Sequence, residues 1–390
     1  MTADRPSWIH PGFRLIDGEG TFGWSELAAL PIPAGGVVFG NRVSTVVAAL
    51  AAAQRDDTPL RLARHGEASM DPSARTGFSV TLESSGTTGT PKRITHNFNR
   101  LSDRLKGLSD VGARWLLTYE PAAFAGLQVI LTAAAAGALL VSVPGGGVAE
   151  LVRASRQHAV THVSGTPSFW RGFLMAAGDA VPPLRSVTLG GEAADQPLLD
   201  RLRQTFPEAR LRHIYASTEA GALFAVADGR AGFPAEWLSE GRDGVALRIR
   251  DGVLEVRSPR AMLAAPGTGD GWLDTGDLVE VAGDRVLFAG RRDGLVNVGG
   301  VKVSPEAVEQ RLLAVPGVAD AAVVPVANPI TGFLLTATVV PAPGGDEAAL
   351  RAALRAATAD LVPAARPRVL TLAAHIPLGA TGKKSRKGLP

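Results

Sequence analysis

The chain has 390 residues, of which 46% are hydrophobic and 20% charged, enough to bury the core of one or two large domains. It contains no cysteine, which excludes thiol nucleophiles, disulfides and cysteine-ligated zinc and fits a cytoplasmic enzyme. The formal net charge is only +3, and no basic run is interleaved with aromatic residues, so we expect no nucleic-acid partner.

The N-terminal residues MTADRPSWIHPGF have no basic head followed by an apolar stretch, so we expect no signal peptide. The longest apolar run, VILTAAAAGALLVSV at 129–143, ends before Pro144 and is shorter than the roughly 20 residues that a membrane span needs. We interpret this run as a buried helix followed by a strand, and we expect no membrane association.

From about residue 78 to 290, short apolar strands alternate with helical stretches. TGFSVTL at 76–82 predicts a strand and RITHNFNRLSDRLKGL at 93–108 a helix. Further along, strands are predicted at RWLLTY, VTHVSG, RSVTLGG and RLRHIYAS, and a helix at LLDRLRQTFP. This alternation predicts an α/β fold with a doubly wound, mostly parallel sheet. DGVALRIRDGVLEVRSP and DLVEVAGDRVLFAGR then predict hairpins.

The pattern changes at GRRDG, residues 290–294. LVNVGGVKV predicts a hairpin, and SPEAVEQRLLAV a helix with Ser304 as N-cap and Pro305 in its first turn. Strands DAAVVPV and LLTATVVP, helix DEAALRAALRAATADL and strand RVLTLA follow. These elements predict a small α+β domain. We therefore divide the chain into residues 1–290 and 291–390, with a hinge at 291–294.

The segment ESSGTTGTPKR at 83–93 is a polar, glycine-rich loop between predicted elements. Glycines allow close approach of the backbone, hydroxyls and N–H groups donate, and a lysine adds charge, so the loop suits phosphate. It is not a Walker A motif, because the spacing of Gly86, Gly89 and Lys92 differs from that pattern.

Six segments, in one order along the chain, resemble the motifs of the acyl-adenylate-forming superfamily of acyl- and aryl-CoA ligases, nonribosomal adenylation domains and luciferases. They are SSGTTGTPK at 84–92, LGGEA at 189–193, YASTE at 215–219, GWLDTGDL at 271–278, GRRDGLVNVGGVKVSPEAVE at 290–309 and PLGATGKKSR at 377–386. Taken singly, each motif residue has a plain structural alternative: Asp277 suits a turn, Glu219 a surface ion pair and Tyr215 a core. The shared order favours the family.

The resemblance implies a role for each motif in using ATP and Mg²⁺. The phosphate loop would supply Ser84, Ser85, Gly86, Thr87, Thr88, Gly89 and Lys92, and the next two motifs would supply Gly190, Gly191, Glu192, Tyr215, Ala216 and Ser217 around adenine. Thr218 would reach the α-phosphate and Glu219 would hold Mg²⁺, while Asp277 and Arg291 would bind the ribose. Lys383 would bridge the carboxylate and the α-phosphate. The small domain would be mobile about Asp293, so that one site serves two half-reactions.

The short N-terminal part, and WLLTYEPAAFAGLQVI at 115–130, look most like the o-succinylbenzoate–CoA ligases, but Ala122 and Ala123 replace that group's two histidines. Glu83, where an aromatic or small residue is usual, is a smaller departure. The candidate acyl pocket is small and apolar, which suits an aryl or short hydrophobic acid. It comprises Ala123, Phe124, Gly126, Gly165, Phe169, Ala220 and Gly221.

We expect coenzyme A as the acceptor of the acyl group. The alternatives are an acyl carrier protein or an amine in a secondary-metabolite pathway, and a nucleotide-binding protein that senses a ligand without catalysis. Lys92, Glu219, Asp277, Arg291 and Lys383 are all present, which argues against the last of these.

Overall fold

The computed structural model describes residues 4–33, 35–64, 77–83, 92–260, 271–379, 382–386 and 389. Its largest sheet has eight strands in the order β12-β11-β10-β9-β7-β8-β1-β2, and all neighbours are parallel except the two outer pairs. The strands are β1 (Arg14–Asp17), β2 (Gly20–Phe22), β7 (Arg114–Leu116), β8 (Leu139–Ser142), β9 (His162–Gly165), β10 (Ser186–Gly190), β11 (Arg210–Ser217) and β12 (Gly221–Val226). The predicted α/β fold with a mostly parallel sheet is confirmed.

Helices connect these parallel strands, as crossover connections require. They are α4 (Phe124–Ala136), α5 (Val148–Gln157), α6 (Pro167–Ala177) and α7 (Gln196–Thr205). The apolar run at 129–143 is confirmed as a buried helix running into a strand, because α4 ends at Gly137 with φ +72° and β8 follows directly. Within the described ranges, none of the helices combines the length and the apolarity of a membrane-spanning segment.

A second sheet has the order β3-β4-β5-β6 and carries the two strands that flank the phosphate-like loop. It consists of β3 (Val37–Phe39), β4 (Leu60–Ala63), β5 (Ser79–Glu83) and β6 (Arg93–Asn97), with α1 (Trp24–Ala28), α2 (Val43–Arg55), α3 (Phe98–Ser102) and η1 (Asp103–Leu105). The helix predicted over 93–108 is therefore wrong at its start. Residues 93–97 pair antiparallel with β5, from Glu83↔Arg93 to Ser79↔Asn97, because Ile94 and His96 alternate into the core with period two. The loop thus joins two strands, not a strand and a helix.

The predicted hairpins of the third sheet are confirmed, and their order is β13-β17-β16-β15-β14. The elements are β13 (Phe233–Pro234), α8 (Trp237–Glu240), β14 (Ala246–Arg250), β15 (Val253–Arg257), β16 (Leu273–Ala282) and β17 (Arg285–Arg291). Aromatic rings from β12, β13, α8 and β17 pack together in its core, including Phe224 against Phe233 at 5.2 Å between ring centroids.

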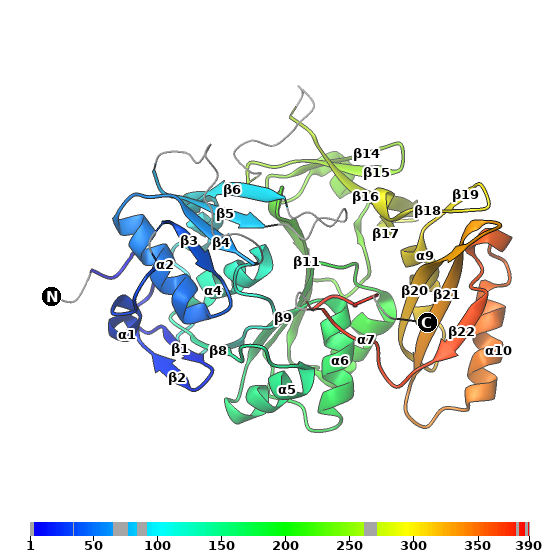
Figure 1. Ribbon diagram of the computed structural model, residues 1–390, viewed down its shortest axis with the longest axis horizontal. Helices are drawn as coiled ribbons and strands as arrows, with labels where there is room; N and C mark the ends of the chain where they lie inside the picture. Colours follow the sequence, from blue (N-terminus) through cyan, green and yellow to red (C-terminus); the bar gives the residue numbers. More distant parts are fainter. Residues whose placement is uncertain are drawn as a thin grey trace.

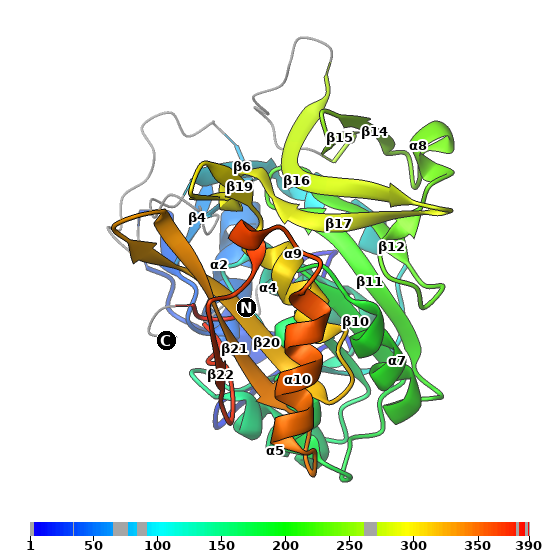
Figure 2. The same cartoon turned by 90° about the vertical axis from the view of Figure 1, so that its right-hand side faces the viewer.

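The C-terminal elements form a small α+β unit with its own core, which includes Leu312, Val323, Leu335 and Leu354 (Figure 2). After η2 (Arg292–Gly294) come β18 (Val296–Val298), β19 (Val301–Val303), α9 (Pro305–Leu313), β20 (Val318–Asn328), β21 (Gly332–Pro341), α10 (Glu347–Thr358), η3 (Pro363–Ala365) and β22 (Val369–Leu372). The predicted cap is confirmed, since the Ser304 hydroxyl accepts a hydrogen bond from Ala307 N at 3.1 Å. The domain boundary after residue 290 and the hinge at 291–294 stay predictions.

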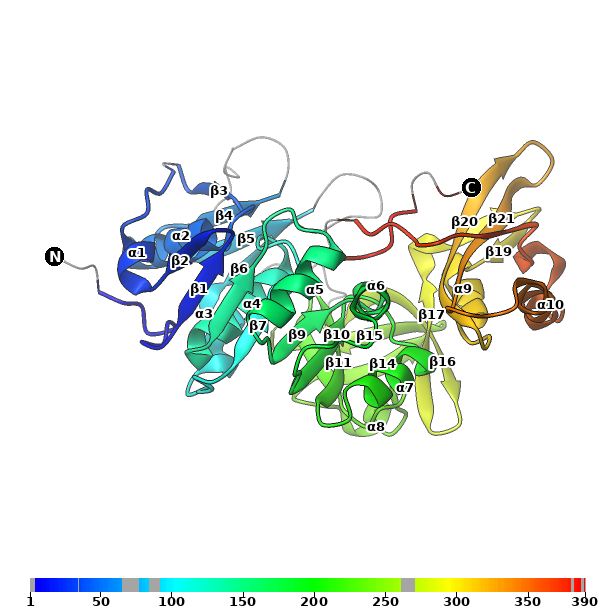
Figure 3. The same cartoon turned by 90° about the horizontal axis from the view of Figure 1, so that it is seen from below.

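The four-stranded sheet and the small unit lie toward opposite ends of the molecule, and β9 and β11 of the eight-stranded sheet lie between them (Figures 1 and 3). The last residues return from the small unit to α6, where the segment drawn in red crosses the middle of the molecule (Figure 1). This return brings Lys383 to the large sheet, beside Gly191.

Candidate active site

The candidate site lies where three neighbouring parallel strands end. Gly165 ends β9, Gly190 ends β10 and Ser217 ends β11, and their registers place these ends at one edge of the sheet. Ligands of open parallel sheets bind outside the carboxyl ends of the strands. Gly191 follows with φ +81°, a conformation that glycine adopts without strain. The backbone therefore turns sharply at this edge and leaves Gly191 exposed.

Tyr215 and Asp277 come together from two different sheets. The Tyr215 hydroxyl donates a hydrogen bond to Asp277 Oδ2, and Arg291 Nη1 donates to Asp277 Oδ1 at 3.1 Å. Arg291 Nε also donates to Asp293 at 2.9 Å. The Tyr215 ring lies 5.4 Å from Phe224 and 5.0 Å from Phe288 between centroids. Three residues predicted to surround a nucleoside are thus in direct contact.

Burial raises the pKa of Asp277, while the hydrogen bond from Tyr215 and the charges of Arg291 and Lys383 act in the opposite direction. Burial and the neighbouring Asp277 charge raise the pKa of Tyr215 well above its ordinary value, so this hydroxyl keeps its proton. The Asp277 carboxylate is 18% exposed, and each of its oxygens can accept more than one hydrogen bond. The carboxylate is therefore suited to accept hydrogen bonds from the hydroxyl groups of a ligand.

Lys383 reaches the same edge from the far end of the chain. A methyl group on Gly191 would lie 3.7 Å from Lys383 Cε. Gly382, the preceding residue, is held by a hydrogen bond from the Thr166 hydroxyl to its carbonyl, at the N-terminus of α6. The structure thus brings Lys383 close to Gly191 and within electrostatic range of Asp277.

Glu192 also points to the start of α6. Its Oε2 accepts hydrogen bonds from the backbone N–H of Ser168 at 3.0 Å and from the Ser168 hydroxyl at 2.6 Å. A carboxylate at this position is stabilised by the helix dipole. Glu192 therefore fixes the turn after β10 against α6.

Thr218 and Glu219 lie in the turn between β11 and β12, and both are half-buried. The Ser217 hydroxyl closes this turn by accepting a hydrogen bond from Ala220 N at 3.0 Å. Gly221 has φ +75°, and an added methyl group would lie 2.8 Å from the Arg260 carbonyl oxygen. Glu219 thus lies in a closely packed turn, and its carboxylate is an oxygen ligand of the kind that Mg²⁺ prefers.

His96 and Tyr119 contribute to this region without having been predicted from the sequence. His96 is 1% exposed, hydrogen bonds to the Thr218 backbone and lies 5.8 Å from the Phe124 ring. Burial lowers its pKa to about 4. The Tyr119 hydroxyl forms a hydrogen bond with the Ser164 side chain, and it would lie 3.9 Å from a methyl group on Gly190. Tyr119 and Tyr215 are the only tyrosines in the chain, and this scarcity is the sequence signal that could have indicated Tyr119.

The residues predicted for the acyl pocket have mixed surroundings. Gly126 lies against the Glu120 carbonyl, the Phe169 ring covers Gly165 and packs on Trp170, and Ala220 is fully buried. Ala123 and Phe124 lie at the start of α4. Close packing accounts for both glycines, and the acyl-binding role of all seven residues stays a prediction.

Residues 84–91 lie outside the described residues, so the phosphate-binding roles of Ser84, Ser85, Gly86, Thr87, Thr88 and Gly89 stay predictions. Lys92 is exposed next to β6. Glu83, the last residue of β5, is 4% exposed and accepts hydrogen bonds from Arg61 Nη2 at 2.5 Å and from Arg64 N at 3.0 Å. The unusual glutamate is therefore a buried ion-pair partner at the base of the loop.

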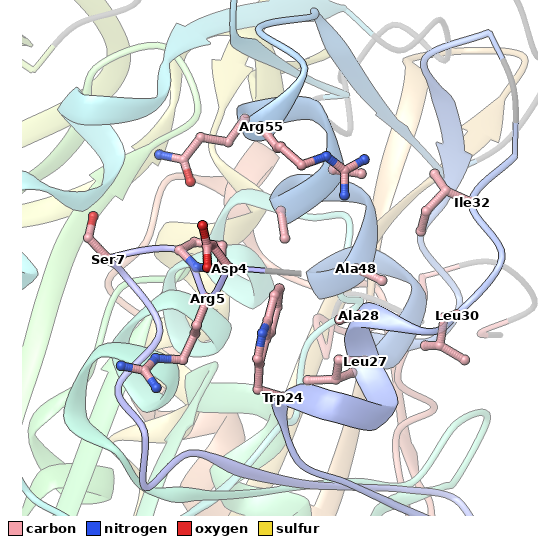
Figure 4. A pocket seen from close by; sticks show the side chains of 14 residues that line it. Asp4, Arg5, Ser7, Trp24, Leu27, Ala28, Leu30, Ile32, Ala48 and Arg55 are labelled. Atoms are coloured by element: carbon pink, nitrogen blue, oxygen red, sulfur yellow. The ribbon is translucent and has the colours of Figure 1, made fainter. Parts of the chain in front are cut away.

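A cavity of about 390 Å³ lies between α1, α2 and the N-terminal residues (Figure 4). Its apolar wall includes Trp24, Leu27 and Ala48. Arg5 and Arg55 also line it. Arg5 donates a hydrogen bond to the Ile9 carbonyl, and Arg55 donates one to Asp56. Its lining includes none of the residues predicted to bind the nucleotide or the acid, so the candidate site is the strand edge and not this cavity.

Comparison with known proteins identifies the family. Residues 37–251, more than half of the chain, match the family described as AMP-binding enzyme, and residues 307–383 match the AMP-binding enzyme C-terminal domain. The chain is 28% identical over 349 residues to the medium/long-chain-fatty-acid–[acyl-carrier-protein] ligase FadD10 of Mycobacterium tuberculosis, covering 78% of this chain and 64% of that protein. It is 28% identical over 267 residues to the 2-succinylbenzoate–CoA ligase of Bacillus subtilis, covering 62% of this chain and 54% of that protein.

The chain thus spans less than two thirds of the length of these relatives. Its fold is similar to that of o-succinylbenzoate coenzyme A synthetase (MenE) from Bacillus subtilis in complex with ATP and magnesium ion. The TM-score is 0.63 at 20% identity, over 96% of this chain and 96% of that one. The chain therefore belongs to the AMP-binding enzyme family, within the acyl-adenylate-forming superfamily whose motifs it carries.

Proposed function

We propose that this protein activates a carboxylic acid with ATP and Mg²⁺ and transfers the acyl group to the thiol of coenzyme A. A carboxylate oxygen attacks the α-phosphorus of ATP, the bond to the bridging oxygen breaks, and pyrophosphate leaves. The thiol sulfur then attacks the acyl carbon of the acyl-AMP, AMP leaves, and the thiol proton passes to solvent. Two of the relatives are named as a CoA ligase and an acyl-carrier-protein ligase, which supports this class of reaction.

The observation that carries the proposal is the position of Lys383 beside Gly191, within electrostatic range of Asp277, at the carboxyl ends of β10 and β11. Carboxylate and phosphate oxygens carry negative charge in the first step, and a positioned ammonium group neutralises it. Asp277 would accept hydrogen bonds from the ribose hydroxyls. Tyr215 and Arg291 hold its carboxylate, and each oxygen can accept a further hydrogen bond. Tyr215 would stack on adenine.

Mg²⁺, when bound, would neutralise charge on the phosphate oxygens. Glu219, in the turn closed by the hydrogen bond from Ala220 N to the Ser217 hydroxyl, would hold it. Phe124 and Phe169 would line the acyl pocket, which suits an aryl or small hydrophobic acid. Asp293, bonded to Arg291, would be the hinge residue.

Exchange of labelled pyrophosphate into ATP, driven by a panel of aryl and alkyl acids, tests the first step. We expect exchange with at least one apolar acid. Adding coenzyme A should then convert that acid to a thioester. Binding of ATP without exchange for any acid would contradict the proposal and favour a ligand sensor.

The second candidate acceptor is the thiol of an acyl carrier protein, which FadD10 is named for. Ala122 and Ala123, at the positions of the two histidines, motivate this alternative. Two results together would favour a carrier protein as the acceptor. Pyrophosphate exchange would occur without thioester formation from free coenzyme A, and a phosphopantetheinylated carrier protein would be loaded.

A further inference from the structure

We propose that Arg171, Asp320 and Lys384 are positioning residues that hold Lys383 at the adenylation site. The proposal rests on the proposed function, in which Lys383 takes part in the first step. Lys383 and Lys384 are neighbours in the sequence, but their surroundings differ. Lys383 is exposed at Gly191, whereas the Lys384 side chain is only 4% exposed.

Lys384 anchors the C-terminal segment to the small unit. Its Nζ lies 2.8 Å from Glu309 Oε1 and 3.0 Å from Asp320 Oδ1, and donates to the Ala321 carbonyl at 2.5 Å. All three donors of this ammonium group are therefore used within the small unit. In the described part of the chain, Lys384 forms no hydrogen bond or ion pair through Nζ with the large sheet.

Arg171 brings the large unit to the same carboxylate. Arg171 lies on α6 with a side chain 6% exposed, and its Nε is 3.6 Å from Asp320 Oδ1. Its Nη2 donates to Asp195, the N-cap of α7. Asp320 on β20 thus contacts one cation from the C-terminal segment and one from the large unit. The pair Arg171–Asp320 joins the two units.

Two more contacts on α6 fix the segment around Lys383. The Thr166 hydroxyl donates to the Gly382 carbonyl, and Leu378 Cδ1 would lie 3.8 Å from a methyl group on Gly172. The backbone of Lys383 is therefore held on one side by Thr166 and on the other by the anchored Lys384. Among the described residues no ion pair of Lys383 itself is found, so its neighbours in the chain fix its position.

The contact between the units is suited to reversible release. If the small unit moves away, Arg171 keeps its ion pair with Asp195, and Asp320 keeps its ion pair with Lys384. No buried charge therefore loses its last ion-pair partner. Leaving a buried charge unpaired is what makes most buried ion pairs costly to break. The Arg171–Asp320 contact therefore favours the adenylating position without locking it.

The test compares the two half-reactions in Arg171→Met, which keeps the apolar stem and removes the charge. We expect pyrophosphate exchange to fall about tenfold, the ratio that corresponds to about 1.4 kcal/mol. Transfer from supplied acyl-AMP to coenzyme A should stay within about twofold of wild type. Asp320→Asn should show the same split, and Arg171→Lys should recover part of the exchange rate.

Arg285→Met is the matched control, because Arg285 is a buried arginine whose partner, Asp228, lies in the same unit. We expect it to lower stability and leave the ratio of the two half-reactions unchanged. A loss of both half-reactions in equal proportion in Arg171→Met and in Asp320→Asn would overturn the proposal, since general destabilisation would explain it.

A distance measurement separates this proposal from the proposed function. The chain has no cysteine, so Gln204→Cys on α7 and Ala353→Cys on α10 allow specific spin labelling of two exposed positions. We expect one main distance between the labels in the otherwise unchanged protein, and a second population in Arg171→Met. An unchanged distance distribution in Arg171→Met overturns the positioning role, whether or not the protein adenylates any acid.

Discussion

Tyr215 and Asp277 lie 62 positions apart in the sequence, yet the Tyr215 hydroxyl donates a hydrogen bond to the Asp277 carboxylate. β11 carries the tyrosine and β16 the aspartate, so the contact joins the eight-stranded sheet to the third sheet. Arg291 bonds to the other oxygen of the same carboxylate. The candidate nucleoside site is therefore organised around one carboxylate before any ligand enters.

Replacing this carboxylate should weaken nucleotide binding. Asp277→Asn removes a charged acceptor, and hydrogen bonds to charged groups contribute about 1.5–3 kcal/mol. We expect the Kd for AMP to rise by about tenfold to a hundredfold in titration calorimetry. Tyr215→Phe keeps the ring and is the control, with a change of about fivefold or less. Equal affinity of Asp277→Asn and wild type would show that the ribose binds elsewhere.

His96 should make the protein sensitive to acid. Its pKa is lowered from 6.5 to about 4 in the folded state, so the unfolded chain binds more protons between these values. Stability contributed by neutral His96 is therefore present above pH 6.5 and is lost as the pH falls toward 4.

Urea unfolding at pH 7.5 and pH 5 measures this effect in wild type and in His96→Gln. The wild type should lose about 2 kcal/mol more than the variant over this interval. His162 and His213 also have pKa values lowered by burial, and they remain in both proteins, so the difference isolates His96. Parallel losses in both proteins would place the acid sensitivity in other groups.

A side chain at Gly221 should destabilise the protein. Gly221→Ala combines strain at φ +75° with a contact of 2.8 Å to the Arg260 carbonyl oxygen, whereas Gly252 has φ +74° and nothing within 4 Å of an added methyl group. Gly252→Ala therefore measures the backbone strain alone, which costs about 1 kcal/mol. We expect Gly221→Ala to lose about 1–3 kcal/mol more in urea unfolding. Similar losses in the two variants would mean that the turn relaxes around the methyl group.

Lys383→Ala should separate the two half-reactions. The ammonium group neutralises charge in the first step, and the proposed movement of the small unit removes it from the site before the second. Pyrophosphate exchange should fall at least a hundredfold, while transfer from supplied acyl-AMP to coenzyme A should remain within about threefold of wild type. A comparable loss of both rates would argue against domain alternation.

The elements that sequence patterns predicted well are those whose signals lie in neighbouring residues. Ser304 and Pro305 start α9, the apolar run at 129–143 is a helix followed by a strand, and RLRHIYAS coincides with β11. The predicted helix over 93–108 is wrong over all of β6, because Arg93–Asn97 becomes a strand only through pairing with β5. The ordered motifs likewise identified the family that residues 37–251 and 307–383 match.

By itself, then, the sequence determined the secondary-structure pattern of most segments, the family and the set of chemically capable residues, since each depends on local periodicity, caps and short motifs. Tertiary structure alone decided that the neighbouring Lys384 is buried against Glu309 and Asp320, that Asp277 is shared by Tyr215 and Arg291, and that Asp320 contacts Arg171. The physical reason is the separation of the interacting residues along the sequence. Hydrogen bonds within a helix or turn connect residues a few positions apart, whereas these ion pairs form only after the topology has brought distant segments together.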